Sequence, residues 1–273
     1  MPEVIDAHVH LSGQRDDGLR AYAEGNSLSY SLEELLRLMG ELGVATGLLL
    51  SSIDLKGVPF PNDDVMQLCA ESRGKLLPAL TVAPNEQTVT DAVGLAKKDH
   101  SVRAFKIMLG YGRTRADDPV FEPLYDHAES SGTPVMFHTG DTAESKGSLM
   151  DAHPLNLDAV ANRHAAMRVV ACHFGNPWIE DVAELVYKHP NVYADVSGMA
   201  AGGGRYAELY ADSLAERLSR AIYYAGSADK VIFGSDYPVT HPAKAIALVE
   251  KLEIDSKDRK KILAGNAKKV YRL

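Results

Sequence analysis

Histidine and aspartate residues stand where apolar β-rich segments of the chain end. His8 and His10 lie in the first segment with one residue between them, so the alternation of side chains along a strand places both imidazoles on one face. Later segments end at His138, His173 and Asp236. Imidazole nitrogens and carboxylate oxygens suit zinc, and also manganese, iron or cobalt. A single histidine is more often a hydrogen-bonded core or surface residue, but these five residues together indicate a catalytic metal site.

Eight β-rich segments position these residues, and an amphipathic segment follows each of them. Most of the β-rich segments are continuously apolar, as is typical of strands buried on both faces of a parallel sheet. They cover residues 3–9, 45–52, 76–83, 102–109, 134–139, 167–174, 191–197 and 230–236. Helices are expected near residues 31–43, 62–73, 87–99, 121–131, 156–165, 178–189, 205–225, 241–252 and 256–271. The first of these begins with a capping box from Ser31 to Glu34 and ends near Gly43.

This alternation predicts an α/β fold, the (β/α)8 TIM barrel, as a single domain over residues 1–273. The rival architecture is a doubly wound open sheet, but that fold usually has fewer strands, and no Gly-x-Gly-x-x-Gly motif follows the first strand. The least regular segments each follow a predicted strand, and in a barrel such loops lie at the end where active sites are built. These segments are 11–30, 110–119, 140–155 and 198–204.

The composition argues against several classes of protein. Hydrophobic residues make up 45% and charged residues 24% of the chain, as in globular proteins rather than disordered or fibrous ones. The net charge of −8 argues against nucleic-acid binding, which needs a basic surface. There are only two cysteines, and neither a secretory leader nor an apolar stretch long enough to span a membrane is visible. We therefore expect a cytoplasmic protein without a membrane partner.

Five motifs are spread over nearly the whole chain. They are His8-Val-His10 after Asp6, His138-Thr-Gly140, His173-Phe-Gly-Asn-Pro-Trp178, Asn191-Val-Tyr-Ala-Asp-Val-Ser-Gly198 and Gly234-Ser-Asp236-Tyr-Pro238. In this order they resemble the amidohydrolase superfamily. More narrowly they resemble its amidohydrolase-2 branch, which includes the aminocarboxymuconate-semialdehyde decarboxylase-like enzymes. The segment Gly265-Asn266-Ala267 is similar to the closing helix of that family.

The resemblance implies that His8, His10, His138 and Asp236 bind a divalent metal, usually zinc, with manganese as the alternative. It also implies that His173 activates the metal-bound water or polarises the substrate. These roles agree with general chemistry, because a bound zinc ion lowers the pKa of water to about 7. Asp236 can then act as general base and later as general acid. Dimerisation through the helices is an expectation from the family alone.

Lys106, in the fourth predicted strand, leaves two alternatives open. In related binuclear enzymes a lysine on this strand is carboxylated and bridges two metal ions, which would make His138 and His173 ligands of the second ion. Alternatively, Lys106 is an unmodified ammonium group that pairs with Asp236 or with a substrate carboxylate. The pattern of His173 and Asp236 resembles the mononuclear branch, so we expect one ion per chain.

Several weaker signals concern substrate binding and support of the site. Arg113 and Arg115, and Arg205 after a run of glycines, could clamp a substrate carboxylate, although solvated surface arginines are more common. Tyr237 could line the pocket. Asp6 either orients a ligand histidine or is satisfied by backbone groups. Cys172 precedes His173, so strand alternation predicts that its side chain points toward the helices.

Three functions fit these residues. The leading hypothesis is a metal-dependent hydrolase that acts on an amide, lactone or ester bond of a small carboxylated substrate. The second is a metal-dependent nonoxidative decarboxylase with the same ligands, and short loops modestly favour hydrolysis over it. The third is a non-enzymatic binding barrel, which would require the metal residues to be vestigial.

Overall fold

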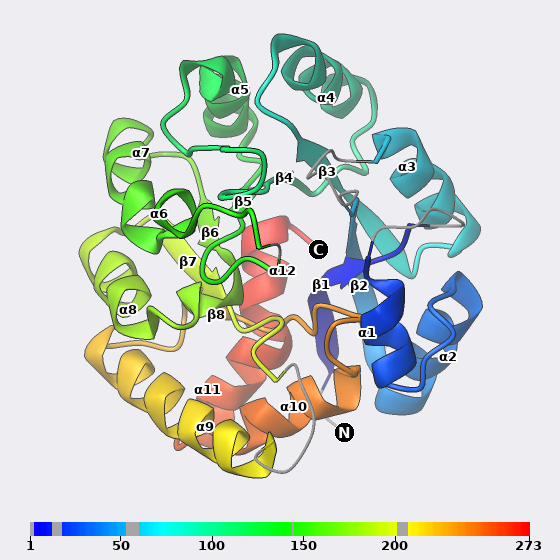
Figure 1. The fold of residues 1–273 in the computed structure, drawn as a ribbon, viewed down its shortest axis with the longest axis vertical. Helices are drawn as coiled ribbons and strands as arrows, with labels where there is room; N and C mark the ends of the chain where they lie inside the picture. Colours follow the sequence, from blue (N-terminus) through cyan, green and yellow to red (C-terminus); the bar gives the residue numbers. More distant parts are fainter. Residues whose placement is uncertain (1–2, 13–17, 53–59, 144, 201–206) are drawn as a thin grey trace.

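A closed ring of parallel strands forms the centre of the molecule. The computed structural model describes residues 3–12, 18–52, 60–143, 145–200 and 207–273. The strands pair in chain order and are β1 Val4–His10, β2 Val44–Leu50, β3 Leu76–Val82, β4 Ala104–Ile107, β5 Val135–Phe137, β6 Val169–Ala171, β7 Val192–Asp195 and β8 Val231–Ile232. The His10 amide donates to the Tyr237 carbonyl (2.8 Å) and the Asp236 amide to the His8 carbonyl (2.8 Å), which closes the ring. The predicted (β/α)8 barrel is confirmed (Figure 1).

Helices surround this ring on all sides (Figure 1). The longer ones are α2 Leu32–Leu42, α3 Asn62–Glu71, α4 Glu86–Lys98, α5 Glu122–Ser131, α7 Leu157–Arg163, α8 Ile179–Lys188, α9 Ala207–Tyr224 and α10 Pro242–Glu250. Short elements are α1 Arg20–Gly25, α6 Leu149–Ala152, and the 3₁₀ turns η1 Pro119–Phe121, η2 Pro154–Asn156 and η3 Cys172–Gly175. The predicted last helix is divided into α11 Ser256–Lys260, the π turn η4 Lys261–Gly265 and α12 Asn266–Tyr271.

The predicted ends of α2 are confirmed. The Ser31 hydroxyl accepts a hydrogen bond from the Glu34 amide at 3.2 Å, which satisfies one of the free amides of the first turn. The helix ends at Gly43, whose φ of 69° is left-handed. None of the described helices is long and apolar enough to cross a membrane.

A bulge in β1 changes which side chains of that strand face inward. Asp6 pairs with Gly47, but Val9 pairs with Leu49, so β1 holds one more residue than β2 over this stretch. Ile5 packs in the cluster inside the barrel, and after the bulge His8 and His10 take the inward positions. Bulges re-aim side chains next to active sites in this way. The alternation of side chains between the inner and outer faces of β1 therefore does not hold between Asp6 and His8.

β6 and β8 end well before their predicted ends, because the chain turns into left-handed conformations after them. β6 ends at Ala171 and is followed by His173 (φ 60°) and Phe174 (φ 45°). β8 ends at Ile232, and Asp236 has a φ of 64°. Positive φ is costly for residues other than glycine and is incompatible with a strand ladder. His173 and Asp236 therefore follow their strands, whereas His8 and His10 belong to β1.

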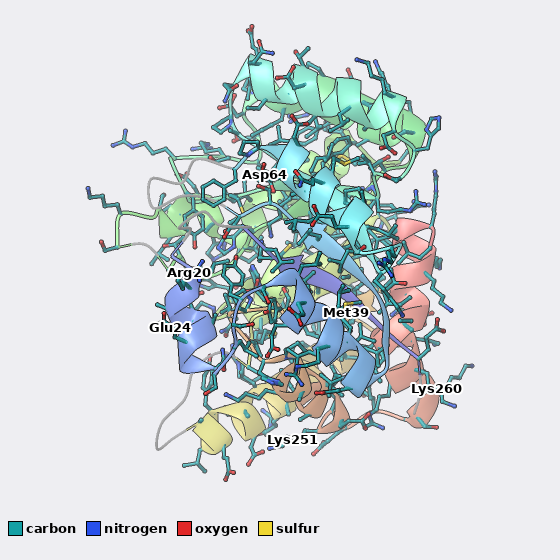
Figure 2. The ribbon with its side chains drawn as sticks, turned by 90° about the vertical axis from the view of Figure 1, so that its right-hand side faces the viewer. Arg20, Glu24, Met39, Asp64, Lys251 and Lys260 are labelled. Carbon is teal, nitrogen blue, oxygen red and sulfur yellow. The ribbon has the colours of Figure 1, made fainter. Side chains whose placement is uncertain are left out.

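The C-terminal segment fills the end of the barrel opposite the candidate site. In Figure 1, α12 lies across the centre of the ring, and its residues pack on the inward-facing cluster. This cluster includes Ile5, Ala79, Ala104, Met136, Val170, Ala267, Val270 and Tyr271. A second cluster lies between the strands and the helices and includes Met39 of α2. Figure 2 shows the two ends from the side, with α1 (Arg20, Glu24) at one end and α11 (Lys260) at the other.

Asn266 fastens α12 to the barrel, and we expect its removal to destabilise the fold. Its buried side-chain amide donates to the carbonyls of Ala228 (2.7 Å) and Val231 (2.6 Å). Asn266→Ala leaves both acceptors unpaired and should lower the free energy of unfolding by about 2–4 kcal/mol. The exposed Asn162 on α7 provides a control, Asn162→Ala, which should unfold like the wild type. Equal melting temperatures for the two variants would contradict this role.

Candidate active site

A buried hydrogen bond between His8 and Asp195 organises the mouth of the barrel. His8 Nδ1 lies 3.0 Å from Asp195 Oδ2, and both side chains are fully buried. Burial lowers the pKa of His8 to about 3, so its imidazole is neutral. Burial raises the pKa of Asp195, but its contacts with His8, His173 and Lys106 lower it by more, so Asp195 is a carboxylate. His8 therefore donates its proton from Nδ1, and its lone pair is on Nε2.

The lone pair of His8 faces another carboxylate. His8 Nε2 lies 3.5 Å from Asp236 Oδ1, and His10 Nε2 lies 3.3 Å from the same oxygen. Burial raises the pKa of Asp236, but His10, His173 and His8 lower it by more, so Asp236 is also ionised. His8 Nε2 is buried and has no hydrogen-bond partner among the described residues. The interaction between a lone pair and a carboxylate that faces it is repulsive unless a cation lies between them.

His8, His10 and Asp236 together fit a divalent cation. Their donor atoms lie within 4.8 Å of one another, and all three side chains are buried. A carboxylate that fixes the tautomer of a ligand histidine, as Asp195 does for His8, is the usual support of a metal-binding imidazole. The set of two imidazole nitrogens and one carboxylate oxygen leaves positions for further ligands.

His138 lies beside this group but is not part of it. Its Nε2 lies 2.8 Å from the Asp141 carbonyl oxygen, so Nε2 carries the proton and Nδ1 the lone pair. Its ring lies 4.9 Å from the ring of His173 and 5.1 Å from that of Tyr111. The structure thus brings three of the four predicted ligands together and leaves the fourth next to His173.

His173 joins the candidate site from the left-handed turn after β6. Its amide donates to Asp195 Oδ1 (2.9 Å), and its Nδ1 lies 3.1 Å from the Ser197 carbonyl oxygen. Its ring lies 5.0 Å from that of His8, and Nδ1 is 3.9 Å from Asp236 Oδ2. The side chain is 15% exposed, whereas that of His8 is fully buried. With Nδ1 donating to the Ser197 carbonyl, only Nε2 of the ring is left to reach a ligand at the mouth.

Sequence reasoning did not single out Asp195 or Ser197. Asp195 Oδ1 accepts from the amides of His173 and Ser197 and from the Ser197 hydroxyl, while Oδ2 accepts from His8. The signal was present, because Asp195 ends β7 within one of the motifs, and the other candidate residues lie at or shortly after the ends of their strands. Gly198 leaves room for the site, since a Cβ there would lie 2.7 Å from Asp236 Oδ2.

Lys106 and Cys172 lie together inside the barrel, next to the candidate site. Lys106 is fully buried, and its Nζ lies 3.1 Å from Cys172 Sγ rather than pairing with Asp236. The predicted outward orientation of Cys172 is wrong, because its side chain belongs to the cluster inside the barrel. Alternation continues from Val170 to Cys172, which both face the inside of the barrel, and it breaks only after Cys172, where His173 takes a left-handed φ of 60°. Cys172 Sγ also lies within 4.8 Å of donor atoms of His8 and Asp195.

The weaker candidates have different positions. Arg113 is exposed in the loop after β4, and Arg115 forms an exposed ion pair with Asp117 (3.0 Å). Arg205 lies outside the described residues. Tyr237 is completely buried in the outer core, where its ring lies 6.2 Å from that of Tyr30. This position argues against contact between Tyr237 and a substrate.

Asp6 is held by backbone groups, which was one of its two predicted roles. Its Oδ1 accepts from the amides of Ser235 (2.8 Å) and His8 (3.3 Å). Burial raises the pKa of Asp6 to about 7, although these hydrogen bonds lower it in part. Asp6 therefore ties the residues before Asp236 to β1.

Both thiols should be unreactive in the native protein. Burial raises the pKa of Cys69 to about 12, and burial followed by the nearby Asp195 raises that of Cys172. At pH 8 only about one Cys69 in ten thousand is then a thiolate, the form that reacts. We expect a disulfide reagent to modify neither cysteine before denaturation and both afterwards. Rapid modification of one thiol in the native protein would contradict the described environments.

The comparisons with known proteins agree with this geometry. A family model described as Amidohydrolase (Amidohydro_2) matches residues 5–273. None of the curated proteins compared matches the chain. Among solved structures, an uncharacterised TIM-barrel protein from Bordetella bronchiseptica is 21% identical, with 98% of each chain covered and a TM-score of 0.75.

Two other solved structures have more informative names. A dihydroxybenzoic acid decarboxylase from Polaromonas sp. JS666, with bound manganese and the inhibitor 2-nitroresorcinol, is 16% identical (100% of this chain, 98% of that chain, TM-score 0.73). A probable 2-pyrone-4,6-dicarboxylic acid hydrolase from Acinetobacter baumannii, with citric acid bound, is 18% identical (99% of each chain, TM-score 0.71). At these identities the similarity shows the fold alone. The family match over almost the whole length goes further: the chain belongs to the amidohydrolase-2 family, a family of enzymes that includes decarboxylases and hydrolases.

Proposed function

We propose that the protein is a metal-dependent hydrolase that cleaves an amide, lactone or ester bond of a small carboxylated substrate. The observation that carries this proposal is the buried Nε2 of His8. It has no hydrogen-bond partner among the described residues, and it faces the ionised Asp236. The hydrogen bond to Asp195 holds the imidazole of His8 in this orientation. The orientation is favourable only if a cation lies between Nε2 and the carboxylate of Asp236.

A divalent ion is supported by the family and by the manganese in the Polaromonas decarboxylase. We propose His8, His10 and Asp236 as ligands, with His138 as the fourth through Nδ1. Zinc suits these nitrogen-rich donors best, with manganese as the alternative, and one ion per chain is expected. Such an ion supplies a Lewis acid that lowers the pKa of water toward neutrality.

The residues around this position can perform the proton transfers of hydrolysis. Asp236 is buried and ionised, so it can accept a proton from the attacking water and return it to the leaving group. His173 is held at Nδ1 by Ser197, and its Nε2, when protonated, can donate a hydrogen bond to the developing oxyanion. Arg113 and Arg205 remain candidates for binding a substrate carboxylate, because a guanidinium can bind one with two parallel hydrogen bonds.

Nonoxidative decarboxylation is the second candidate function. It is favoured by the dihydroxybenzoic acid decarboxylase among the structurally similar proteins. The same donor set would serve it, with Asp236 passing a proton taken up from water to the carbon whose C–C bond breaks as carbon dioxide leaves. Incubation with carboxylated lactones, esters and aromatic acids in ¹⁸O-water separates the two. Label in the organic product without carbon dioxide release supports hydrolysis. Carbon dioxide release without label in the organic product supports decarboxylation.

Metal binding should depend on Asp195, which would support the proposed ion indirectly by orienting His8. In Asp195→Asn the amide can donate to His8 Nδ1, which moves the proton to Nε2 and removes the donor lone pair. We expect about one zinc or manganese per wild-type chain by elemental analysis, and affinity for the metal lower by about 10- to 100-fold in this variant. Asp91→Asn, at an exposed position on α4, is the matched control and should bind like the wild type.

Two results of this measurement would contradict the proposal. Equal metal affinity in Asp195→Asn and the wild type would mean that His8 is not a ligand through Nε2. Two ions per chain would instead favour the carboxylated form of Lys106. Asp236→Ala, which removes a proposed ligand itself, should bind metal still more weakly than Asp195→Asn.

His173 should affect turnover more than metal content. His173→Asn removes the proposed donor to the oxyanion, and we expect kcat to fall by about 10²- to 10⁴-fold with the metal retained. His153→Asn changes a histidine near the mouth that stacks on Trp178 (4.7 Å between ring centroids), and it should leave kcat nearly unchanged. Full turnover of His173→Asn on a substrate found by the screen would show the catalytic assignment to be wrong.

A further inference from the structure

A cavity lies at the end of the barrel that α12 closes, away from the candidate active site. Its volume is about 370 Å³, within the range of sites for small ligands. Arg103 comes directly before β4 and Pro134 directly before β5, whereas His138 follows β5, so the cavity is at the opposite end from the candidate active site. It is lined by Ala96, Lys97, His100, Val102, Arg103, His127, Ser131, Gly132, Thr133, Pro134, Tyr271 and Arg272.

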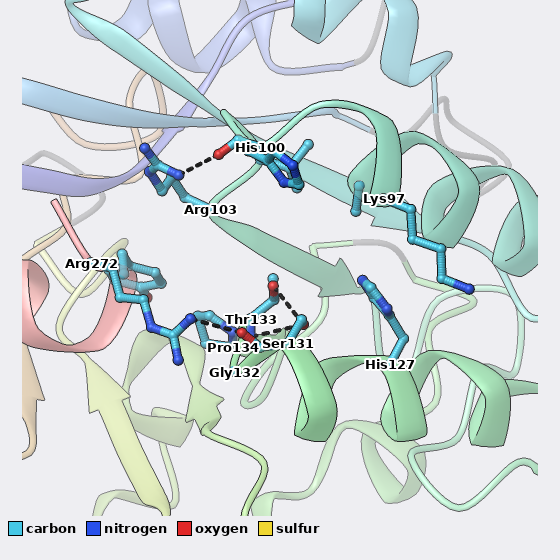
Figure 3. A pocket seen from close by; sticks show the side chains of 12 residues that line it. Lys97, His100, Arg103, His127, Ser131, Gly132, Thr133, Pro134 and Arg272 are labelled. Carbon is cyan, nitrogen blue, oxygen red and sulfur yellow. Dashed lines mark hydrogen bonds between the residues drawn. The ribbon is translucent and has the colours of Figure 1, made fainter.

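The charged groups of this cavity are all basic. Lys97, Arg103 and Arg272 are cations, the imidazoles of His100 and His127 lie with them, and no lining residue carries a carboxylate. Figure 3 shows Lys97, His100 and Arg103 along one side, and His127 and Arg272 along the other. Burial, and then the charge of Lys97, lowers the pKa of His127, which is consistent with a positive potential in the cavity. This local charge contrasts with the net charge of −8 for the whole chain.

Backbone carbonyls hold the two guanidinium groups in place. Arg103 Nη1 donates to the His100 carbonyl (2.6 Å), and Arg272 Nη1 donates to the Ser131 carbonyl (2.7 Å). Arg103 Nε is buried and has no hydrogen-bond partner among the described residues. Arg272 lies directly over Gly132, where an added Cβ would be 2.0 Å from Nη2. Both guanidinium groups are thus hydrogen-bonded to neutral acceptors, and neither forms an ion pair with a carboxylate among the described residues, although the charge of Asp99 interacts with Arg103.

We propose that this cavity is a binding site for a compact, multiply charged oxyanion, either a phosphate group or a small dicarboxylate. Such a ligand supplies several acceptors for the N–H groups of Arg103 and Arg272, and Lys97 adds a further charge. The hydroxyls of Ser131 and Thr133, which bond to each other at 2.9 Å, lie between them. The site is distinct from the proposed metal centre and goes beyond the proposed hydrolase function.

The test uses inorganic phosphate and succinate as probes on the full-length protein. NMR titration at constant ionic strength, with sodium chloride as the reference salt, should give saturable shifts of the amides of Ser131, Gly132 and Thr133. Saturation by phosphate alone identifies a phosphate site, and saturation by succinate alone identifies a dicarboxylate site. Shifts that do not saturate, or that chloride produces equally, would overturn the proposal.

Two adjacent lysines on α4 provide a matched pair of variants. Both lysines are exposed, but Lys97 lines the cavity and Lys98 does not. Lys97→Met should weaken binding by roughly threefold to tenfold, and Arg272→Met by roughly tenfold or more. Lys98→Met should bind like the wild type. Equal weakening in Lys97→Met and Lys98→Met would show a general charge effect and overturn the site, as would wild-type affinity in Arg272→Met.

Discussion

His8 and Asp195 are 187 residues apart in the chain and meet in a hydrogen bond of 3.0 Å within the barrel. Because Asp195 is ionised and His8 neutral, this bond fixes which nitrogen of His8 carries the proton. The free nitrogen then faces Asp236, a buried carboxylate. Two negative groups around the neutral imidazole of His8 need a cation, and the metal-dependent chemistry that we propose depends on this constraint.

The barrel makes this meeting possible because parallel strands bring all their carboxyl ends to one side. Final placement depends on irregularities at those ends. The bulge in β1 turns His8 and His10 inward, and the positive φ angles of His173 and Asp236 direct their side chains away from the strand ladder. Such conformations are costly and persist only where surrounding contacts enforce them. Hydrogen bonds from the backbone of His173 to Asp195, and from Ser235 to Asp6, do this here.

The sequence predicts the regular part of the molecule well and the irregular part poorly. Apolar runs give all eight strands, and Ser31 and Gly43 give the ends of α2, since these signals are local. The orientation of Cys172 was mispredicted, because nothing local shows that the alternation breaks at His173, whose φ is positive. Asp195 was missed as a partner of His8, since a pairing across the barrel depends on strand register. The cavity near Arg272 was also not foreseen, because it combines three separate segments.

The central claim is that one divalent ion lies between His8 Nε2, His10 and Asp236, and anomalous diffraction tests it most directly. Crystals grown with zinc, measured on both sides of the zinc absorption edge, should show one peak per chain at about 2.0–2.2 Å from His8 Nε2. Asp195 should still contact His8 Nδ1 in that structure. The account would be contradicted by the absence of a peak at this position, or by two peaks joined through a carboxylated Lys106.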